Sequence, residues 1–209
     1  LRNARGGSRP DLCDVTRAII RAGANGITIH PRPDQRHIRP QDVFDLRAVV
    51  AAAKDVEFNI EGNPTAGPRE NGYPGFRQLV EAAKPAQCTL VPDTEHQLTS
   101  DHGWDLYETT TFDNVKSIIS TYQDLGTRVS LFIDPDPDQI SRARDAGADR
   151  IELYTGPYAD AAAKYGIDSK EAHEHWKRYR RSVIHAKEQG LGINAGHDLN
   201  LINLARFCS

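Results

Sequence analysis

Six short apolar runs, each ending in polar residues, alternate with amphipathic segments along the chain, and this alternation limits the possible folds most strongly. The apolar runs are 26–30, 56–61, 87–92, 128–134, 150–156 and 192–197. The amphipathic segments are 11–21, 40–54, 76–83, 112–125, 138–146 and 169–189. Such runs are typical of buried parallel strands and such segments of helices, so the sequence predicts a repeated strand–helix unit.

Proline and glycine mark where several predicted helices begin and end. Pro40 and Pro137 are predicted in first turns, where a missing backbone N–H costs nothing. Gly23 and Gly147 each stand in an Ala-Gly-Ala sequence just before an apolar run. We expect both glycines to end helices in the left-handed conformation, which glycine adopts without steric cost.

Repeated strand–helix units form either a closed (β/α)8 barrel or an open, doubly wound sheet. An open sheet usually carries a glycine-rich phosphate turn after its first strand, and the sequence contains neither G-x-G-x-x-G nor a P-loop. Polar residues end nearly every run, as in a barrel whose active site collects at the carboxyl ends of its strands. We therefore predict an α/β fold, a (β/α)8 TIM barrel with six central strands in this chain. Residues 1–209 are predicted to form one domain, incomplete at both ends.

The composition argues against several classes of protein. With 26 Lys and Arg against 29 Asp and Glu, the net charge is −3, so we expect no binding to nucleic acid. No apolar stretch approaches the roughly 20 residues of a membrane helix, so we expect no membrane association. The three cysteines, Cys13, Cys88 and Cys208, are odd in number and far apart, which predicts a cytoplasmic protein without a disulfide framework.

The polar residues after the first run are candidate site residues. His30, Arg32 and His37 stand within eight positions of one another. Imidazole titrates near neutral pH and the guanidinium fork matches phosphate, so these residues favour acid/base chemistry on a phosphorylated metabolite. A solvated polar loop after a strand is the alternative interpretation.

Three further titratable residues lie at or near the ends of later runs. Partial desolvation at a strand end would suit Glu61 to proton transfer, and an ion pair with Arg32 is the alternative. His197 follows small residues that let a ligand approach, and a hydrogen bond to the cap of the next helix is its alternative. Glu152 interrupts an apolar run, so its carboxylate must be paired, hydrated or protonated, and we expect it to point into the barrel.

The pattern of histidines and lysines does not suit metal or Schiff-base chemistry. Arg32 stands where a metal-dependent barrel would place a second histidine after His30. His173 and His175 are two apart on a predicted helix, hence on different faces. No visible run ends in the lysine that a Schiff base requires. We expect neither a metal nor an organic cofactor.

Seven segments, taken in order, closely resemble the pyridoxine 5'-phosphate synthase family. They are 1–6, 26–38, 58–62, 90–92, 129–134, 151–156 and 194–200. The resemblance spans the whole chain and implies a (β/α)8 barrel enzyme. Members of the family condense 1-deoxy-D-xylulose 5-phosphate with 3-amino-2-oxopropyl phosphate, forming pyridoxine 5'-phosphate, phosphate and water. The resemblance further implies a transferase-class, ring-closing synthase that needs no cofactor and assembles with copies of itself into a homo-octamer.

The resemblance also implies roles for individual residues. His30 and Glu61 correspond to proton acceptors and His197 to a proton donor. Glu152 corresponds to a fixed carboxylate that stabilises charge in the transition state. The residues that correspond to substrate contacts are Arg32, His37 and Thr99 for the deoxyxylulose phosphate, and Arg5 and Gly196 or His197 for the aminoketone phosphate, with Asp198 beside them.

The resemblance implies strands beyond both ends of the chain, and two other functions are alternatives. The family's first strand would precede Leu1 and its eighth would follow Ser209, so we expect this chain alone to be inactive. A non-catalytic barrel or fragment that binds phosphorylated metabolites is one alternative function. Another phosphosugar enzyme, an aldolase or isomerase, is the second.

Overall fold

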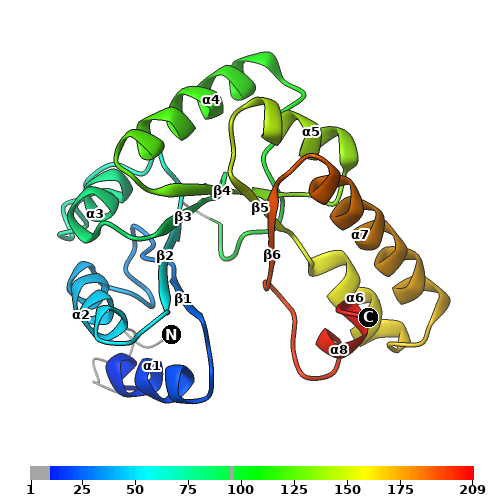
Figure 1. Ribbon diagram of the computed structural model, residues 1–209, viewed down its shortest axis with the longest axis horizontal. Helices are drawn as coiled ribbons and strands as arrows, with labels where there is room; N and C mark the ends of the chain where they lie inside the picture. Colours follow the sequence, from blue (N-terminus) through cyan, green and yellow to red (C-terminus); the bar gives the residue numbers. More distant parts are fainter. Residues whose placement is uncertain (1–9, 95–96) are drawn as a thin grey trace. The chain divides into compact units, whose positions relative to one another are not determined.

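The computed structural model describes residues 10–94 and 97–209, in which helices and strands alternate along the chain. They belong to two compact units. The first extends to Gln97 and includes Thr121–Val129, and the second comprises Leu98–Ser120 and Ser130–Ser209. Parallel strands separated by helices confirm the predicted α/β class and the six strands expected of a partial (β/α)8 barrel (Figure 1). A single domain over 1–209 stays a prediction.

Strands follow one another in chain order within each unit. The strands are β1 (Gly26–Ile29), β2 (Glu57–Gly62), β3 (Gln87–Leu90), β4 (Arg128–Ile133), β5 (Arg150–Leu153) and β6 (Gly192–Ala195). The helices are α1 (Leu12–Arg21), α2 (Pro40–Ala51), α3 (Phe76–Ala83), α4 (Thr109–Asp124), α5 (Pro137–Asp145), α6 (Gly156–Tyr165), α7 (Lys170–Glu188) and α8 (Leu204–Phe207). In the first unit β2 pairs in parallel with β1 and β3. In the second unit β5 pairs in parallel with β4 and β6.

The predicted signals at the helix ends are confirmed. Pro40 and Pro137 occupy the first turns of α2 and α5. Gly23 follows α1 with a φ of +100°, and Gly147 follows α5 with a φ of +96°. These angles lie in the left-handed region, so the two glycines turn the chain from helix toward β1 and β5.

The predicted strand 150–156 is wrong at its end, because β5 stops at Leu153 and Gly156 begins α6. The sequence does not indicate this helix, since Gly156-Pro157 directly after a strand resembles a break in regular structure. Pro157 is tolerated in the first turn, and α6 gains its stability by packing against α7. The short helix α8 is likewise absent from the sequence prediction. Most other predicted runs extend slightly past the observed strands, so His30 and His197 lie just beyond strand ends.

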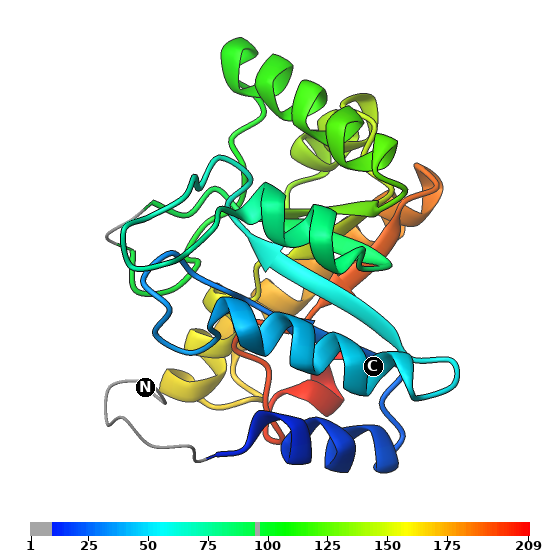
Figure 2. The same cartoon turned by 90° about the vertical axis from the view of Figure 1, so that its left-hand side faces the viewer.

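The core of the first unit lies between β2, β3 and the helices α2 and α3. Ile60 of β2 and Leu79 of α3 are fully buried. Figure 2 shows α2 lying beside both α1 and α3, which it contacts. At the end of β2, a Cβ on Gly62 would lie 2.5 Å from the ring of Phe76. Only glycine admits this close approach, which fixes the start of α3 against the strand end that carries Glu61.

The core of the second unit depends on the apolar stripe of α7. This helix packs against α5, α6 and β6. Ala172, Tyr179 and Ala186 are buried along this stripe, which lies within the predicted amphipathic segment 169–189. Arg180 and Arg181 of the same helix are exposed. In the described part of the chain, no helix has both the length and the apolar character needed to cross a membrane.

Candidate active site

The ends of β1 and β2 place an imidazole beside a carboxylate. Ile29 of β1 pairs with Ile60 of β2, so the residues that follow, His30 and Glu61, are neighbours at the same level of the sheet. Nδ1 of His30 lies 2.9 Å from Oε1 of Glu61, and the side chains are 19% and 13% exposed. Beside an ionised Glu61 carboxylate, which only accepts hydrogen bonds, Nδ1 would carry the proton and leave Nε2 of His30 to exchange one.

A second charged pair follows the same strands. Nη1 of Arg32 is 2.8 Å from Oδ2 of Asp93, and these side chains are 12% and 5% exposed. Nδ2 of Asn63 donates to the backbone oxygen of Asp93 at 2.7 Å. Residues that follow β1, β2 and β3 therefore meet, as expected at the carboxyl ends of adjacent parallel strands.

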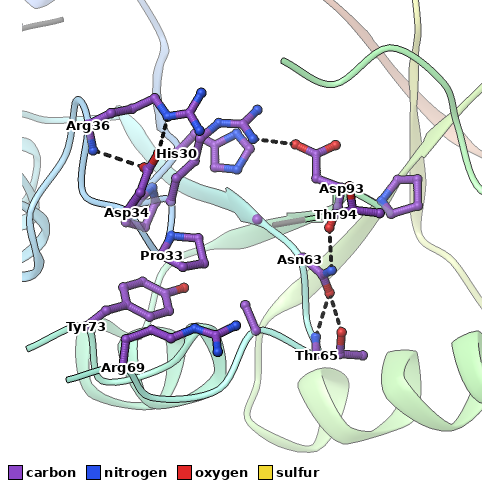
Figure 3. Close-up of a pocket in the computed structure, with 15 residues that line it drawn as sticks. His30, Pro33, Asp34, Arg36, Asn63, Thr65, Arg69, Tyr73, Asp93 and Thr94 are labelled. Carbon is purple, nitrogen blue, oxygen red and sulfur yellow. Dashed lines mark hydrogen bonds and ion pairs between the residues drawn. The ribbon is translucent and has the colours of Figure 1, made fainter. Parts of the chain in front are cut away.

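These segments enclose a cavity of about 290 Å³ in the first unit (Figure 3). His30 lies in its lining, together with Arg32, Arg36 and Arg69. Guanidinium groups present rigid forks of N–H donors that match phosphate and carboxylate groups. The cavity therefore combines a proton-exchanging group with groups suited to an anionic ligand.

Two side-chain contacts hold the loop after β1 against the loop after β2. Nε2 of Gln35 donates to the backbone oxygen of Asn71 at 2.8 Å. In return, Nδ2 of Asn71 donates to the backbone oxygen of Pro33 at 2.8 Å. Pro33, Arg69 and Tyr73 from these loops line the cavity together (Figure 3). The loop after β2 is thus part of the site and more than a connection to α3.

The sequence does not single out Arg69, Tyr73 or Asn63. Their loop, 63–75, is rich in glycine and proline and carries no periodic pattern, so it resembles a simple connection. The one indication in the sequence is that Arg69 lies in a loop that follows a polar strand end. In the structure Tyr73 is buried, and burial raises the pKa of its phenol while the nearby Arg69 opposes the rise. The phenol therefore stays protonated and remains a hydrogen-bond donor at neutral pH.

His37 lies in a different environment from Arg32, with which the sequence groups it. Its side chain is exposed, and the cavity lining found in the described chain does not include it. Partial loss of hydration, together with the positive charges of Arg36 and Arg32, lowers the pKa of His37. His37 is therefore biased toward its neutral form.

In the second unit, His197 lies between Asp198 and Thr99. Its Nδ1 is 2.7 Å from Oδ2 of Asp198, and its Nε2 is 2.9 Å from Oγ1 of Thr99. The Thr155 hydroxyl donates to the backbone oxygen of His197. The structure thus brings together three residues that the sequence names for the site, and it links them through hydrogen bonds.

The other candidate residues are placed as follows. Glu152 lies in β5, with its side chain on the half-buried face that Arg150 shares. Gly196 follows β6 and is exposed, whereas Arg5 lies outside the described residues. Across residues 10–94 and 97–209, no three His, Cys, Asp or Glu side chains are grouped so that they could hold a metal ion.

Acid/base side chains at the ends of parallel strands, beside a cavity lined by guanidinium groups, define an enzyme of the α/β class. The family model for "Pyridoxal phosphate biosynthesis protein PdxJ" matches residues 1–209, and the chain belongs to this family. The resemblance found in the sequence is thereby confirmed.

Relatives of the chain carry the name of one enzyme. Pyridoxine 5'-phosphate synthase of Xanthomonas axonopodis pv. citri (strain 306) is 52% identical over 207 residues, which cover 99% of this chain and 78% of the relative. Pyridoxine 5'-phosphate synthase of Cytophaga hutchinsonii is 49% identical over 204 residues, which cover 98% of this chain and 77% of the relative. The expectation of an enzyme in pyridoxine biosynthesis is confirmed, and the non-catalytic alternative loses its support.

More distant similarity concerns the fold alone. A solved structure of mandelate oxidase matches with a TM-score of 0.55 and 16% sequence identity, over 87% of this chain and 56% of that one. Identity this low says nothing about shared chemistry, which depends on the residues of the site.

Proposed function

We propose that this enzyme condenses 1-deoxy-D-xylulose 5-phosphate with 3-amino-2-oxopropyl phosphate, forming pyridoxine 5'-phosphate, phosphate and water. The observation that carries the proposal is the contact between His30 and Glu61, because joining an amine to a ketone and closing a ring requires groups that accept and return protons. The guanidinium groups in the adjoining cavity support a phosphorylated substrate.

Proton transfer is assigned to three residues. The amine of one substrate and the carbonyl of the other form an imine, with loss of water. Glu61 or His30 then removes a carbon-bound proton, and the electron pair left behind converts the imine to an enamine. His197 gives a proton to a departing oxygen, so that the C–O bond breaks as phosphate or water leaves.

Substrate binding is assigned partly from geometry and partly from family resemblance. Arg32 is assigned to the phosphate of deoxyxylulose phosphate, since it lines the cavity and a guanidinium matches phosphate. The assignments that rest on resemblance alone are His37 and Thr99 to the same substrate, Arg5 and Gly196 to the aminoketone phosphate, and Glu152 to charge stabilisation in the transition state.

The proposal includes the setting in which the enzyme works. Family resemblance supports a transferase-class synthase that needs no metal or organic cofactor and forms a homo-octamer. The near-balanced charge and the scattered cysteines support a cytoplasmic protein that binds small phosphorylated substrates and neither nucleic acid nor membranes.

An omission experiment tests the proposed reaction. Purified full-length protein is incubated with both substrates or with either one alone, and pyridoxine 5'-phosphate and inorganic phosphate are quantified. Both products are expected only when both substrates are present. Consumption of deoxyxylulose phosphate alone would instead indicate a phosphosugar aldolase or isomerase. A protein that consumes neither substrate would sink the proposal.

A further inference from the structure

Three polar groups of the second unit form a continuous line of hydrogen bonds. Oδ2 of Asp198 lies 2.7 Å from Nδ1 of His197, and Nε2 of the same ring lies 2.9 Å from Oγ1 of Thr99. The side chain of His197 is 21% exposed and that of Asp198 is 43% exposed. Both nitrogens of the imidazole therefore have a specified partner.

The chemistry of these partners decides where the imidazole proton resides. An ionised carboxylate accepts hydrogen bonds and donates none, so Asp198 requires a proton on Nδ1 of His197. A hydroxyl both accepts and donates, so Thr99 tolerates Nε2 in either state. Neutral His197 accepts the Thr99 proton at Nε2, and protonated His197 donates from Nε2 to Thr99. Nε2 is thus the nitrogen that changes its protonation.

An unusual backbone conformation brings the carboxylate back to the preceding ring. Asp198 has a φ of +63°, in the left-handed region, which aspartate adopts more readily than most residues with a Cβ. Nδ2 of Asn203 donates to the backbone oxygen of Asp198 at 3.2 Å and so ties this turn to the segment before α8. The contact between Asp198 and His197 is therefore built into the loop.

Two aromatic rings lie near the imidazole. The ring centroids of Phe132 and Tyr154 lie 6.0 Å and 5.9 Å from that of His197. The Thr155 hydroxyl donates to the backbone oxygen of His197, which anchors the main chain as well. The contacts to Asp198 and Thr99 thus orient Nε2 in the free protein.

We propose that Asp198 is a positioning residue for His197, holding the ring proton on Nδ1 so that Nε2 alone exchanges protons, on the side that Thr99 occupies. This role replaces the substrate contact suggested for Asp198 by family resemblance, and it rests on the proposed function of His197 as proton donor. In the donor step the Nε2–H bond of protonated His197 breaks and an O–H bond forms on the departing group. The ring is left neutral with its Nδ1 proton in place, and the Asp198 carboxylate stays ionised throughout.

Other titratable groups share this environment and provide a matched control. Tyr154 faces the ring from the end of β5, and burial raises the pKa of its phenol. The carboxylates that add to this rise, largest first, are Asp198, Asp160, Asp101 and Asp134. Asp160 is exposed on α6, so Asp160→Asn removes the same charge nearby while leaving the contact between Asp198 and His197 intact.

Nitrogen-15 NMR of the histidine side chains tests the proposal directly. Spectra are recorded on the free protein above the titration range of histidine, and His197→Asn identifies the signals of His197. We expect the Nδ1–H tautomer in the parent protein and in Asp160→Asn. Asp198→Asn and Asp198→Gly should convert His197 mainly to the Nε2–H tautomer. Glycine adopts a positive φ without steric cost, so Asp198→Gly removes the carboxylate and keeps the loop.

Kinetics of the same variants separate positioning from substrate binding. We expect kcat to fall about 10-fold or more in both Asp198 variants, within the roughly 10²–10⁴-fold that general acid catalysis supplies, while KM stays within about 2-fold. Asp160→Asn should match the parent protein. A large rise in KM with unchanged kcat would contradict a positioning role.

The two readouts also distinguish failure of this proposal from failure of the proposed function. An Nε2–H tautomer in the parent protein, or an unchanged tautomer in both Asp198 variants, overturns the positioning role whatever the activity. Altered tautomers with unchanged kcat overturn it as well. A full-length parent protein that makes no pyridoxine 5'-phosphate refutes the proposed function, and the donor role of His197 then falls with it.

Discussion

His30 and Glu61 show how a short contact can carry a chemical role. Their contact needs only that β1 and β2 be parallel and that Ile29 pair with Ile60, because the next residue on each strand then stands at the same level. The sequence predicts this placement from the polar strand ends alone. It does not predict which partner each side chain takes, since that depends on rotamers and on loops such as the one holding Asp93.

Replacing Glu61 tests the proton-accepting role. In Glu61→Gln the side chain keeps its size but cannot take a proton, so kcat should fall about 10²–10⁴-fold with the fold unchanged. Glu70→Gln, in the loop that follows the same strand, is the matched control, because Glu70 is exposed. Steady-state kinetics with both substrates and thermal unfolding check the pair. A kcat of Glu61→Gln within about 2-fold of the parent value would show that Glu61 takes no part in proton transfer.

Replacing Arg69 tests the cavity as a phosphate site. Arg69→Ala removes one guanidinium from the lining, so KM for deoxyxylulose phosphate should rise about 10-fold while kcat changes little. Arg69→Lys should give an intermediate value, because lysine keeps the charge but loses the fork. Arg77→Ala is the control, since Arg77 is exposed on α3 and pairs there with Glu81. Equal KM values for Arg69→Ala and the control would place the phosphate elsewhere.

Among the structural elements, the strands and long helices are predictable from the sequence, whereas some loops and helix starts are not. The strands and the long helices are predicted by the spacing of apolar residues, because this spacing is a local property of the sequence. The sequence does not predict helix α6 for two reasons. Its start at Gly156-Pro157 resembles a break in regular structure, and its buried face is defined by packing against α7. The wall containing Arg69 and Tyr73 is missed because Gln35 and Asn71 close it from two distant loops.

The junction between β2 and α3 makes a stability prediction. A Cβ at Gly62 would lie 2.5 Å from the Phe76 ring, so Gly62→Ala should destabilise the protein by about 1–3 kcal/mol through overpacking. Gly67→Ala is the control in the following loop, because a Cβ there meets nothing within 4 Å. Urea unfolding measures both variants. Equal stability of the two would show that α3 shifts without cost.

The start of α4 makes a prediction about acid stability. Glu108 accepts hydrogen bonds from the backbone N–H groups of Thr111 and Thr110, and these lower its pKa from 4.5 to about 2. Because the pKa is lower in the folded state, the carboxylate stabilises the protein fully above about pH 4.5, and this contribution is lost as the pH falls toward 2. Urea unfolding across this range should show a shallower pH dependence for Glu108→Gln than for the parent protein. The same pH dependence in Glu108→Gln and the parent protein would mean that the hydrogen bonds of Glu108 do not persist in solution.

Features that indicate the fold class and the family occur along the whole chain. The strand–helix alternation and the seven family-like segments run from one end of the sequence to the other, and the family model matches residues 1–209. These features made the fold class and the family predictable. The hydrogen-bonded line through Asp198, His197 and Thr99 was not predictable, since it depends on a φ of +63° at Asp198 that no sequence pattern encodes.

The most direct test of the central claim is the ratio of pyridoxine 5'-phosphate to inorganic phosphate during turnover of both substrates. The proposed condensation predicts equal amounts of the two products at every time point, and loss of both together in Glu61→Gln. Phosphate released without pyridoxine 5'-phosphate, or equal product formation by Glu61→Gln and the parent protein, would contradict the account.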